Sequence, residues 1–63
     1  MGYYYAKWTE WGGTTAEAQT DKGEYALKEY SGVSLGSGKI MLKMEPISEA
    51  EFERNKRNGM TTI

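Results

Sequence analysis

The chain has 63 residues, a formal net charge of −1, and neither Cys nor His. Without thiols or imidazoles, the sequence excludes disulfide bonds, Cys- or His-based catalysis and ordinary zinc sites. So short a chain also has little material with which to enclose a substrate pocket. We therefore expect one domain over residues 1–63 that is not an enzyme and that holds no metal or cofactor.

The apolar residues are a few aliphatics supplemented by two Trp, five Tyr and four Met. Because aromatic rings bury large areas, we expect a folded domain that depends on them. No stretch approaches the roughly 20 apolar residues of a membrane span, and the start of the chain lacks the basic and apolar regions of a signal peptide. These patterns predict a soluble, cytoplasmic protein that does not contact a membrane.

The first two elements are predicted to form a hairpin. Residues 3–11 are rich in aromatic residues and Thr, which strands prefer. The Gly-Gly pair at 12–13 tolerates the positive φ angles of a two-residue turn, so residues 14–20 are expected to return as the second strand. A helix over 14–20 is the alternative, because Thr14 and Glu17 have the spacing of a capping box. So short a helix is marginal by itself, which favours the strand.

Two further strands are expected after turns that contain Gly. Residues 21–23, Asp-Lys-Gly, suit a type I turn followed by a bulge, and residues 24–31 are interpreted as the third strand. The Gly-rich loop 32–38 leads to a fourth strand at residues 39–45. Strict alternation places Ile40, Leu42 and Met44 on one side of that strand and Met41, Lys43 and Glu45 on the other.

The start of the C-terminal helix is the strongest local signal in the chain. Pro46 ends the preceding strand because it cannot donate to a ladder. Ser48 and Glu51 have the spacing of an N-cap residue and its capping box. A helix over residues 48–58 is therefore predicted, followed by a frayed tail at residues 60–63.

The predicted fold class is α+β: a small antiparallel β-meander of three to four strands with one C-terminal α-helix packed on one face. With a two-residue turn in the first hairpin, one face of the sheet collects apolar residues and forms the core. Ile47 and Phe52 are expected to bring the helix against this face. The predicted core residues of the sheet are Tyr4, Ala6, Trp8, Tyr25 and Leu27, joined by Ile40, Leu42 and Met44.

A single helix cannot cover both faces of a sheet, so the opposite face is expected to be open. It combines rings and lysines over a floor of small residues at Ala16, Ala18 and Ala26. Exposed ring clusters mark interaction sites, although the same rings also stabilise a thin sheet by pairing across strands. The candidate binding residues on this face are Tyr3, Tyr5, Lys7, Trp11, Lys28 and Tyr30.

Binding to another protein is the predicted function, through this aromatic face or the acidic start of the helix. The edge strands predicted at residues 3–11 and 39–45 are also expected to add to a partner's sheet or to that of a second copy of the chain. Nucleic-acid binding is the alternative, because rings interleaved with Lys are typical of proteins that bind single strands. The sequence pI of about 5.3 argues against it, since affinity for phosphates needs a basic excess. A homodimer that uses the open face as its own interface is the third hypothesis.

The spacing of residues argues against two other kinds of site, a phosphate-binding loop and a catalytic pair of carboxylates. Residues 36–39, Gly-Ser-Gly-Lys, lack the pattern of a phosphate-binding loop and lead into a strand rather than a helix. Glu49, Glu51 and Glu53 are two positions apart, so they point to different sides of the helix. These carboxylates complement the helix dipole and do not form an acid–base pair.

In size, acidity and architecture the chain loosely resembles small sheet-plus-helix proteins of phages and mobile elements. Many of those proteins bind and inhibit a host protein, so the resemblance implies an inhibitor or modulator of that kind. No motif in the sequence carries the resemblance, and it assigns no residues.

Overall fold

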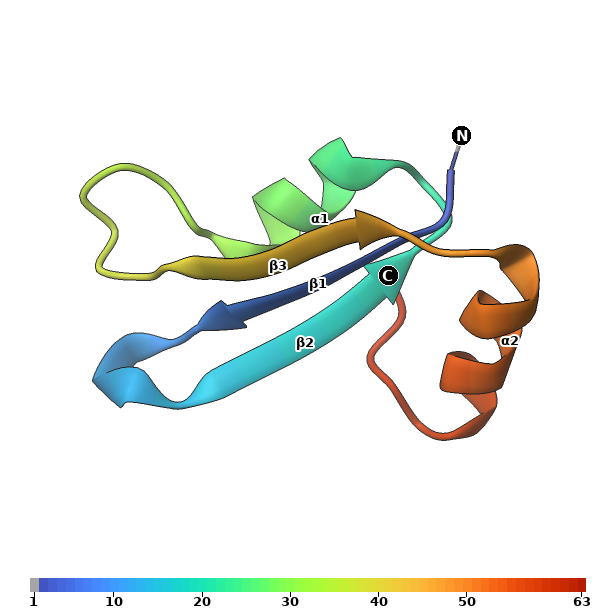
Figure 1. Ribbon diagram of the computed structural model, residues 1–63. Coiled ribbons are helices and arrows are strands. Elements are labelled where there is room, and N and C mark those ends of the chain that lie inside the picture. Colours follow the sequence, from blue (N-terminus) through green and yellow to red (C-terminus); the bar gives the residue numbers. More distant parts are fainter. Residues whose placement is uncertain (1) are drawn as a thin grey trace.

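The computed structural model describes residues 2–63 and contains a three-stranded antiparallel sheet with two helices (Figure 1). In chain order the elements are β1 (Tyr4–Thr9), the 3₁₀ turn η1 (Trp11–Gly13), β2 (Thr15–Thr20), α1 (Glu24–Ser31), β3 (Met41–Pro46) and α2 (Glu49–Arg57). β1 lies in the centre of the sheet, between β2 and β3, so the prediction that residues 3–11 form an edge strand is wrong. The fold class is therefore α+β with an antiparallel sheet, but the described part of the chain has two helices where the sequence predicts one.

The segment predicted as the third strand, residues 24–31, is the helix α1. Leu27 and Ser31 lie one helical turn apart and are both buried, so a helical spacing matches the buried side of the segment. Gly32 ends the helix in the left-handed conformation, with φ of 72°, and its N–H donates to the Glu29 carbonyl at 3.3 Å. Helix and strand are hard to distinguish by periodicity in so short a segment, and here the strand prediction is wrong.

The turn between β1 and β2 is longer than the predicted two-residue turn. The Glu10 N–H donates to the Thr14 carbonyl at 2.6 Å, and η1 lies between these residues. The register is therefore shifted by one residue, and Trp8 lies opposite Ala16. Because a shift of one residue exchanges the faces of a strand, the alanines of β2 lie on the same face as Trp8. The prediction that Ala16 and Ala18 lie on the open face is therefore wrong.

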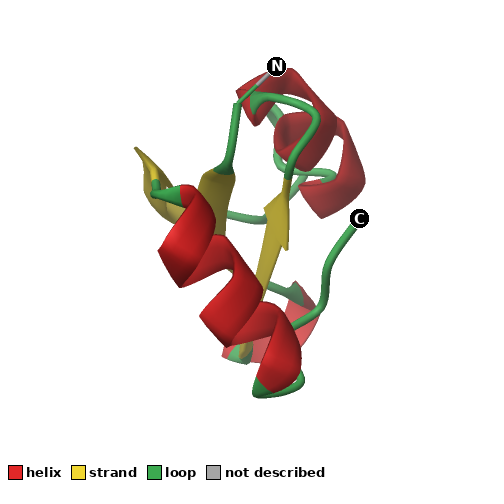
Figure 2. Cartoon of the chain, turned by 90° about the vertical axis from the view of Figure 1, so that its right-hand side faces the viewer, coloured by secondary structure: helices red, strands yellow, loops and turns green. Residues whose placement is uncertain are grey.

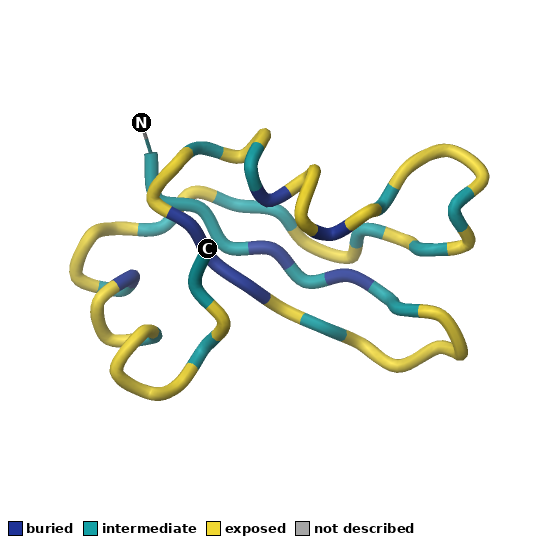
Figure 3. The backbone as a smooth tube through the Cα atoms, turned by 180° about the vertical axis from the view of Figure 1, so that it is seen from behind, coloured by how far each residue is buried: buried dark blue, intermediate teal, exposed yellow. Residues whose placement is uncertain are grey.

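α1 packs on the face of the sheet that carries Tyr4, Ala6 and Trp8, which we call the inner face. Ala6, Trp8, Ala18 and Leu27 are buried and form the core cluster. Figure 3 shows that the buried parts of the chain are short stretches separated by half-buried and exposed ones. The small alanines let the helix approach the strands closely, while Trp8 supplies a large apolar area. Partly buried side chains surround this cluster: Tyr4, Ala16, Val33, Met41, Met44 and Ile63.

α2 covers only one end of the opposite, outer face, and Figure 2 shows the two helices on opposite sides of the strands. Phe52 is buried, and its ring centroid lies 4.9 Å from that of Tyr3. The sequence places Phe52 on the inner face, and this prediction is wrong because α1 occupies that face. The predicted cap is present: the Ser48 hydroxyl accepts a hydrogen bond from the Glu51 N–H at 3.1 Å.

The C-terminal tail, predicted to be frayed, is fixed against β2. The Gln19 N–H donates to the Thr61 carbonyl at 2.9 Å, and the Ile63 N–H donates to the Gln19 carbonyl at 3.0 Å. The buried Gln19 side chain also donates from Nε2 to the Phe52 carbonyl at 2.9 Å and to Thr62 Oγ1 at 3.0 Å. The tail therefore closes one end of the outer edge of β2 and links this strand to α2.

Candidate binding surface

The predicted binding residues do not share one surface. Tyr3, Tyr5 and Lys7 lie on the outer face, at β1 and the residue before it. Trp11 lies in the turn η1, and Lys28 and Tyr30 lie on α1, on the other side of the sheet. Their predicted common face requires a strand at residues 24–31, and it is lost because this segment is helical.

The two predicted rings on the outer face are engaged in contacts within the fold. The Tyr5 hydroxyl donates to Glu17 Oε2 at 2.7 Å. Burial, this hydrogen bond and the negative charges of Glu17 and Glu45 raise the pKa of Tyr5 to about 12. Tyr3 packs against the buried ring of Phe52. Tyr5 therefore links β1 to β2, and Tyr3 links the start of β1 to α2.

The remaining predicted rings lie away from the outer face of β1. Tyr30 packs edge-on against Trp8, with ring centroids 6.2 Å apart and an interplanar angle of 82°. Trp11 is 77% exposed and lies beside the loop that precedes β3, where a Cβ added to Gly38 would lie 3.8 Å from two atoms of its ring. Trp11 is thus the predicted ring that keeps most of its area accessible.

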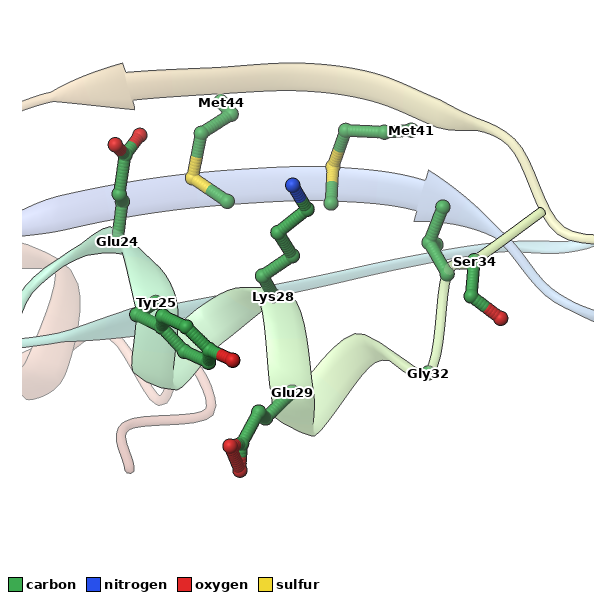
Figure 4. Close-up of a pocket in the computed structure, with 9 residues that line it drawn as sticks. Glu24, Tyr25, Lys28, Glu29, Gly32, Ser34, Met41 and Met44 are labelled. Atoms are coloured by element: carbon green, nitrogen blue, oxygen red, sulfur yellow. The ribbon is translucent and has the colours of Figure 1, made fainter.

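A groove of about 770 Å³ runs between α1 and β3. It exists because α1 packs mainly on β1 and β2 and leaves the inner face of β3 uncovered. Figure 4 shows the side chains of Met41 and Met44 extending from β3 toward α1, with Lys28 reaching between them. Apolar residues therefore form the floor of the groove, and the charged side chains of Glu24 and Lys28 line its helical wall, whereas the side chain of Glu29 points away from β3.

A bulge in β3 produces this apolar floor. The register of β1 with β3 shifts between Lys7 and Trp8, so that Leu42 is an extra residue on β3. Met41 and Met44 are three positions apart, and the bulge brings both to the inner face. Strict alternation predicts opposite faces for these two residues, so sequence reasoning missed them as parts of one site.

Three predicted core residues are exposed instead. Tyr25 is 71% exposed because α1 turns Leu27 rather than Tyr25 toward the sheet. Ile40 and Leu42 are 63% and 52% exposed, and the bulge leaves them outside the inner-face cluster. The apolar material of β3 is therefore divided between the groove and the solvent.

β3 is the outermost strand on its side of the sheet. The Tyr3 carbonyl accepts from the Ile47 N–H at 2.9 Å, so the odd-numbered residues at this end of β1 bond toward β3. Met44 lies opposite the even-numbered Ala6, and alternation therefore directs the N–H and C=O groups of Met44 away from β1. The edge of β3 is thus open at Met44, whereas the edge of β2 is bonded to the tail at Gln19.

A polar cluster joins the loop before β3 to the first hairpin. Lys39 Nζ lies 3.4 Å from Glu10 Oε2 and donates to the Ser31 carbonyl at 3.1 Å. Glu10 also accepts from Trp8 Nε1 at 2.9 Å. This hydrogen bond, aided by the charge of Lys39, lowers the pKa of Glu10 below its ordinary value. The ammonium group of Lys39 is therefore used within the fold.

Comparisons with known proteins give no match, whether with family models, curated proteins or solved structures. Within residues 2–63, no three acidic, His or Cys side chains are grouped as a metal ion would require. In the same range, no helix combines the length and the apolar character needed to cross a bilayer. The most distinctive surface feature of the described residues is an apolar groove beside an open strand edge.

Proposed function

We propose that this chain is a non-enzymatic protein-binding module whose binding surface is the groove between α1 and β3 together with the open edge of β3. The observation that carries the proposal is that outward-facing backbone groups at Met44 adjoin a floor made by Met41 and Met44. An extended segment that adds to such an edge gains backbone hydrogen bonds, and its alternate side chains enter the groove. Methionine side chains adapt to apolar groups of different shape.

The charges around the groove support a peptide rather than a nucleic acid as its occupant. Lys28 is the single basic residue among those that line the groove, and Glu24 lines the same helical wall, so the groove lacks the basic excess that binding to phosphate groups requires. The outer face is also mixed in charge, because Lys7 lies opposite Glu17. Tyr25 offers an exposed ring beside Lys28, but neither face carries the excess of basic charge that single-stranded nucleic acids require.

The proposal includes a cytoplasmic location and a regulatory role. Small extracellular domains usually depend on disulfide bonds, and this chain has no Cys. Inhibition or modulation of a host protein, which the resemblance to small phage proteins implies, fits a module that occupies a strand edge of its target.

Selection of short random peptides displayed on phage, with the full chain immobilised, tests this function. The selected peptides are expected to alternate apolar and polar residues, and to shift the backbone amide signals of β3 and α1. Met44→Lys, which places a charge on the groove floor, is expected to weaken their binding by about tenfold or more. The matched change Thr15→Lys on exposed β2 is expected to leave the affinity unchanged.

Two outcomes would contradict the groove as the binding surface. Shifts confined to Trp11 and Tyr5 would favour the predicted aromatic surface. The second probe is a mixed-sequence single-stranded oligonucleotide, titrated at low salt, where attraction to phosphates is strongest. Shifts around Lys7 and Tyr5 that weaken as salt rises would replace the proposal with nucleic-acid binding.

A further inference from the structure

We infer that the partner that fits this edge is a second copy of the chain, with β3 paired antiparallel to β3 about a twofold axis at Met44. The inference rests on the proposed function, because it uses the same strand edge and groove. It specifies the register and symmetry of the edge pairing that the sequence predicts only in general terms at residues 39–45, and it differs from the homodimer whose interface is the open sheet face.

The backbone at Met44 has the orientation that this pair requires. Its N–H and C=O groups point away from β1, so two facing Met44 residues exchange two hydrogen bonds, as the hydrogen-bonded pairs of an antiparallel ladder do. Two residues further along, Pro46 has no N–H to donate, so the ladder ends there. The edge therefore offers a short ladder centred on Met44.

Side-chain charge selects this register over its neighbours. Opposing residues of an antiparallel pair lie on the same face, so centring on Met44 places Lys43 of each copy opposite Glu45 of the other. Centring on Lys43 or on Glu45 places two like charges opposite each other, which is destabilising. Within one chain Lys43 Nζ already lies 3.7 Å from Glu45 Oε1, so the four side chains form one patch of alternating charge.

On the inner face the same pairing joins the two grooves. A twofold axis perpendicular to the sheet keeps both α1 helices on one side, so each Met44 packs against its counterpart and Met41 extends the floor at both ends. The pairing thus covers methionine surface that a single copy leaves in the open groove. Two three-stranded sheets become one continuous sheet with β3 at its centre.

Analytical ultracentrifugation of the full chain, from micromolar to millimolar concentration, measures this association. The expected species has a mass near twice 7.1 kDa. Lys43→Glu and Glu45→Lys each create like-charge contacts at both symmetric positions, and each is expected to weaken dimerisation by about tenfold. Lys56→Glu, the matched charge reversal on the exposed side of α2, is expected to leave dimerisation unchanged.

An equimolar mixture of the two single variants separates interface effects from effects within one chain. The Lys43→Glu chain has two acidic side chains at these positions, and the Glu45→Lys chain has two basic ones. Pairing between the variants therefore restores opposite charges at both contacts. The expected result is a heterodimer in the mixture and weak association of each variant alone, which misfolding of either variant cannot produce.

Three results would overturn the inference. If the unmodified chain stays monomeric at every concentration while its β3 edge binds the selected peptides, the self-pairing is wrong and the proposed function stands. If a dimer forms but tolerates both charge reversals, its interface lies elsewhere and the inference is wrong. If the chain neither dimerises nor binds peptides, both proposals are wrong.

Discussion

The two faces of the sheet hold their helices by different interactions. On the inner face, α1 packs Leu27 into a cluster with Trp8 and the strand alanines. On the outer face, α2 contributes one buried ring, that of Phe52, and hydrogen bonds from the buried Gln19 side chain complete the contact. One helix is thus secured by apolar burial and the other by a single ring with a polar clamp, so different substitutions should loosen each.

Removal of the apolar anchor of α1 should have the largest effect. Leu27 is fully buried, and Leu27→Ala is expected to cost about 2–5 kcal/mol of unfolding free energy because it leaves a cavity under the helix. Urea denaturation followed by circular dichroism measures this loss. Leu35→Ala is the control, since Leu35 is fully exposed in the loop before β3 and should change stability by less than about 0.5 kcal/mol. Equal effects of the two substitutions would contradict the core described for α1.

Loss of the polar clamp should have a smaller and more local effect. Gln19→Met keeps the length of the side chain but removes the hydrogen bonds from Nε2 to the Phe52 carbonyl and to Thr62 Oγ1, at an expected cost of about 0.5–1.5 kcal/mol for each bond. Amide hydrogen exchange should accelerate most at Ile63 and in α2, and less in α1. Thr15→Met, an exposed site on the same strand, is the control. A uniform acceleration in both helices would show that the two faces do not open separately.

The smallest expected effect comes from removing the hydrogen bond between Tyr5 and Glu17. Glu17→Gln removes a negative charge while burial persists, so the pKa of Tyr5 should fall from about 12 toward its ordinary value of 10 without reaching it. Ultraviolet absorbance during an alkaline titration measures this change. Glu29→Gln on α1 is the control, and an equal shift in both variants would contradict the assignment to Glu17.

The raised pKa of Tyr5 also predicts how stability depends on pH. The unfolded chain ionises this phenol near pH 10, whereas the folded chain retains the proton to about pH 12. The contribution of Tyr5 to stability is therefore complete below pH 10 and declines as the pH rises toward 12. In the Glu17→Gln variant this decline should be smaller.

Elements with strong local signals could be predicted from the sequence, and elements fixed by distant contacts could not. The aromatic segment of β1 and the Ser48 cap of α2 depend on neighbouring residues, and both are present. β2 is a strand, where the sequence left strand and helix open. The position of the tail depends on Gln19, far away in the chain, and no local pattern indicates it.

The candidate site was predicted less well than the fold because residues 24–31 are a helix rather than a strand, and because the face of each strand residue depends on register. A turn with one residue more than expected moved the alanines of β2 to the inner face, and a bulge at Leu42 brought Met41 and Met44 together. Each event changes the face of a side chain without changing the type of its element. Among the predicted binding residues, Lys28 does line the groove, although it reaches it from a helix rather than from a strand.

The pairing of the C-terminal tail with β2 also means that the edge of β2 is completed late during protein synthesis. Gln19 and Thr62 are 43 positions apart, so the first hairpin and α1 leave the ribosome well before the residues that close this edge. Until residues 61–63 are available, the backbone of Gln19 lacks its partners and the end of β2 is open to strands of other chains. A nascent chain that stalls in α2 would therefore be prone to pair with strands of other chains. Synthesis of residues 61–63 supplies the groups that bond to the end of β2.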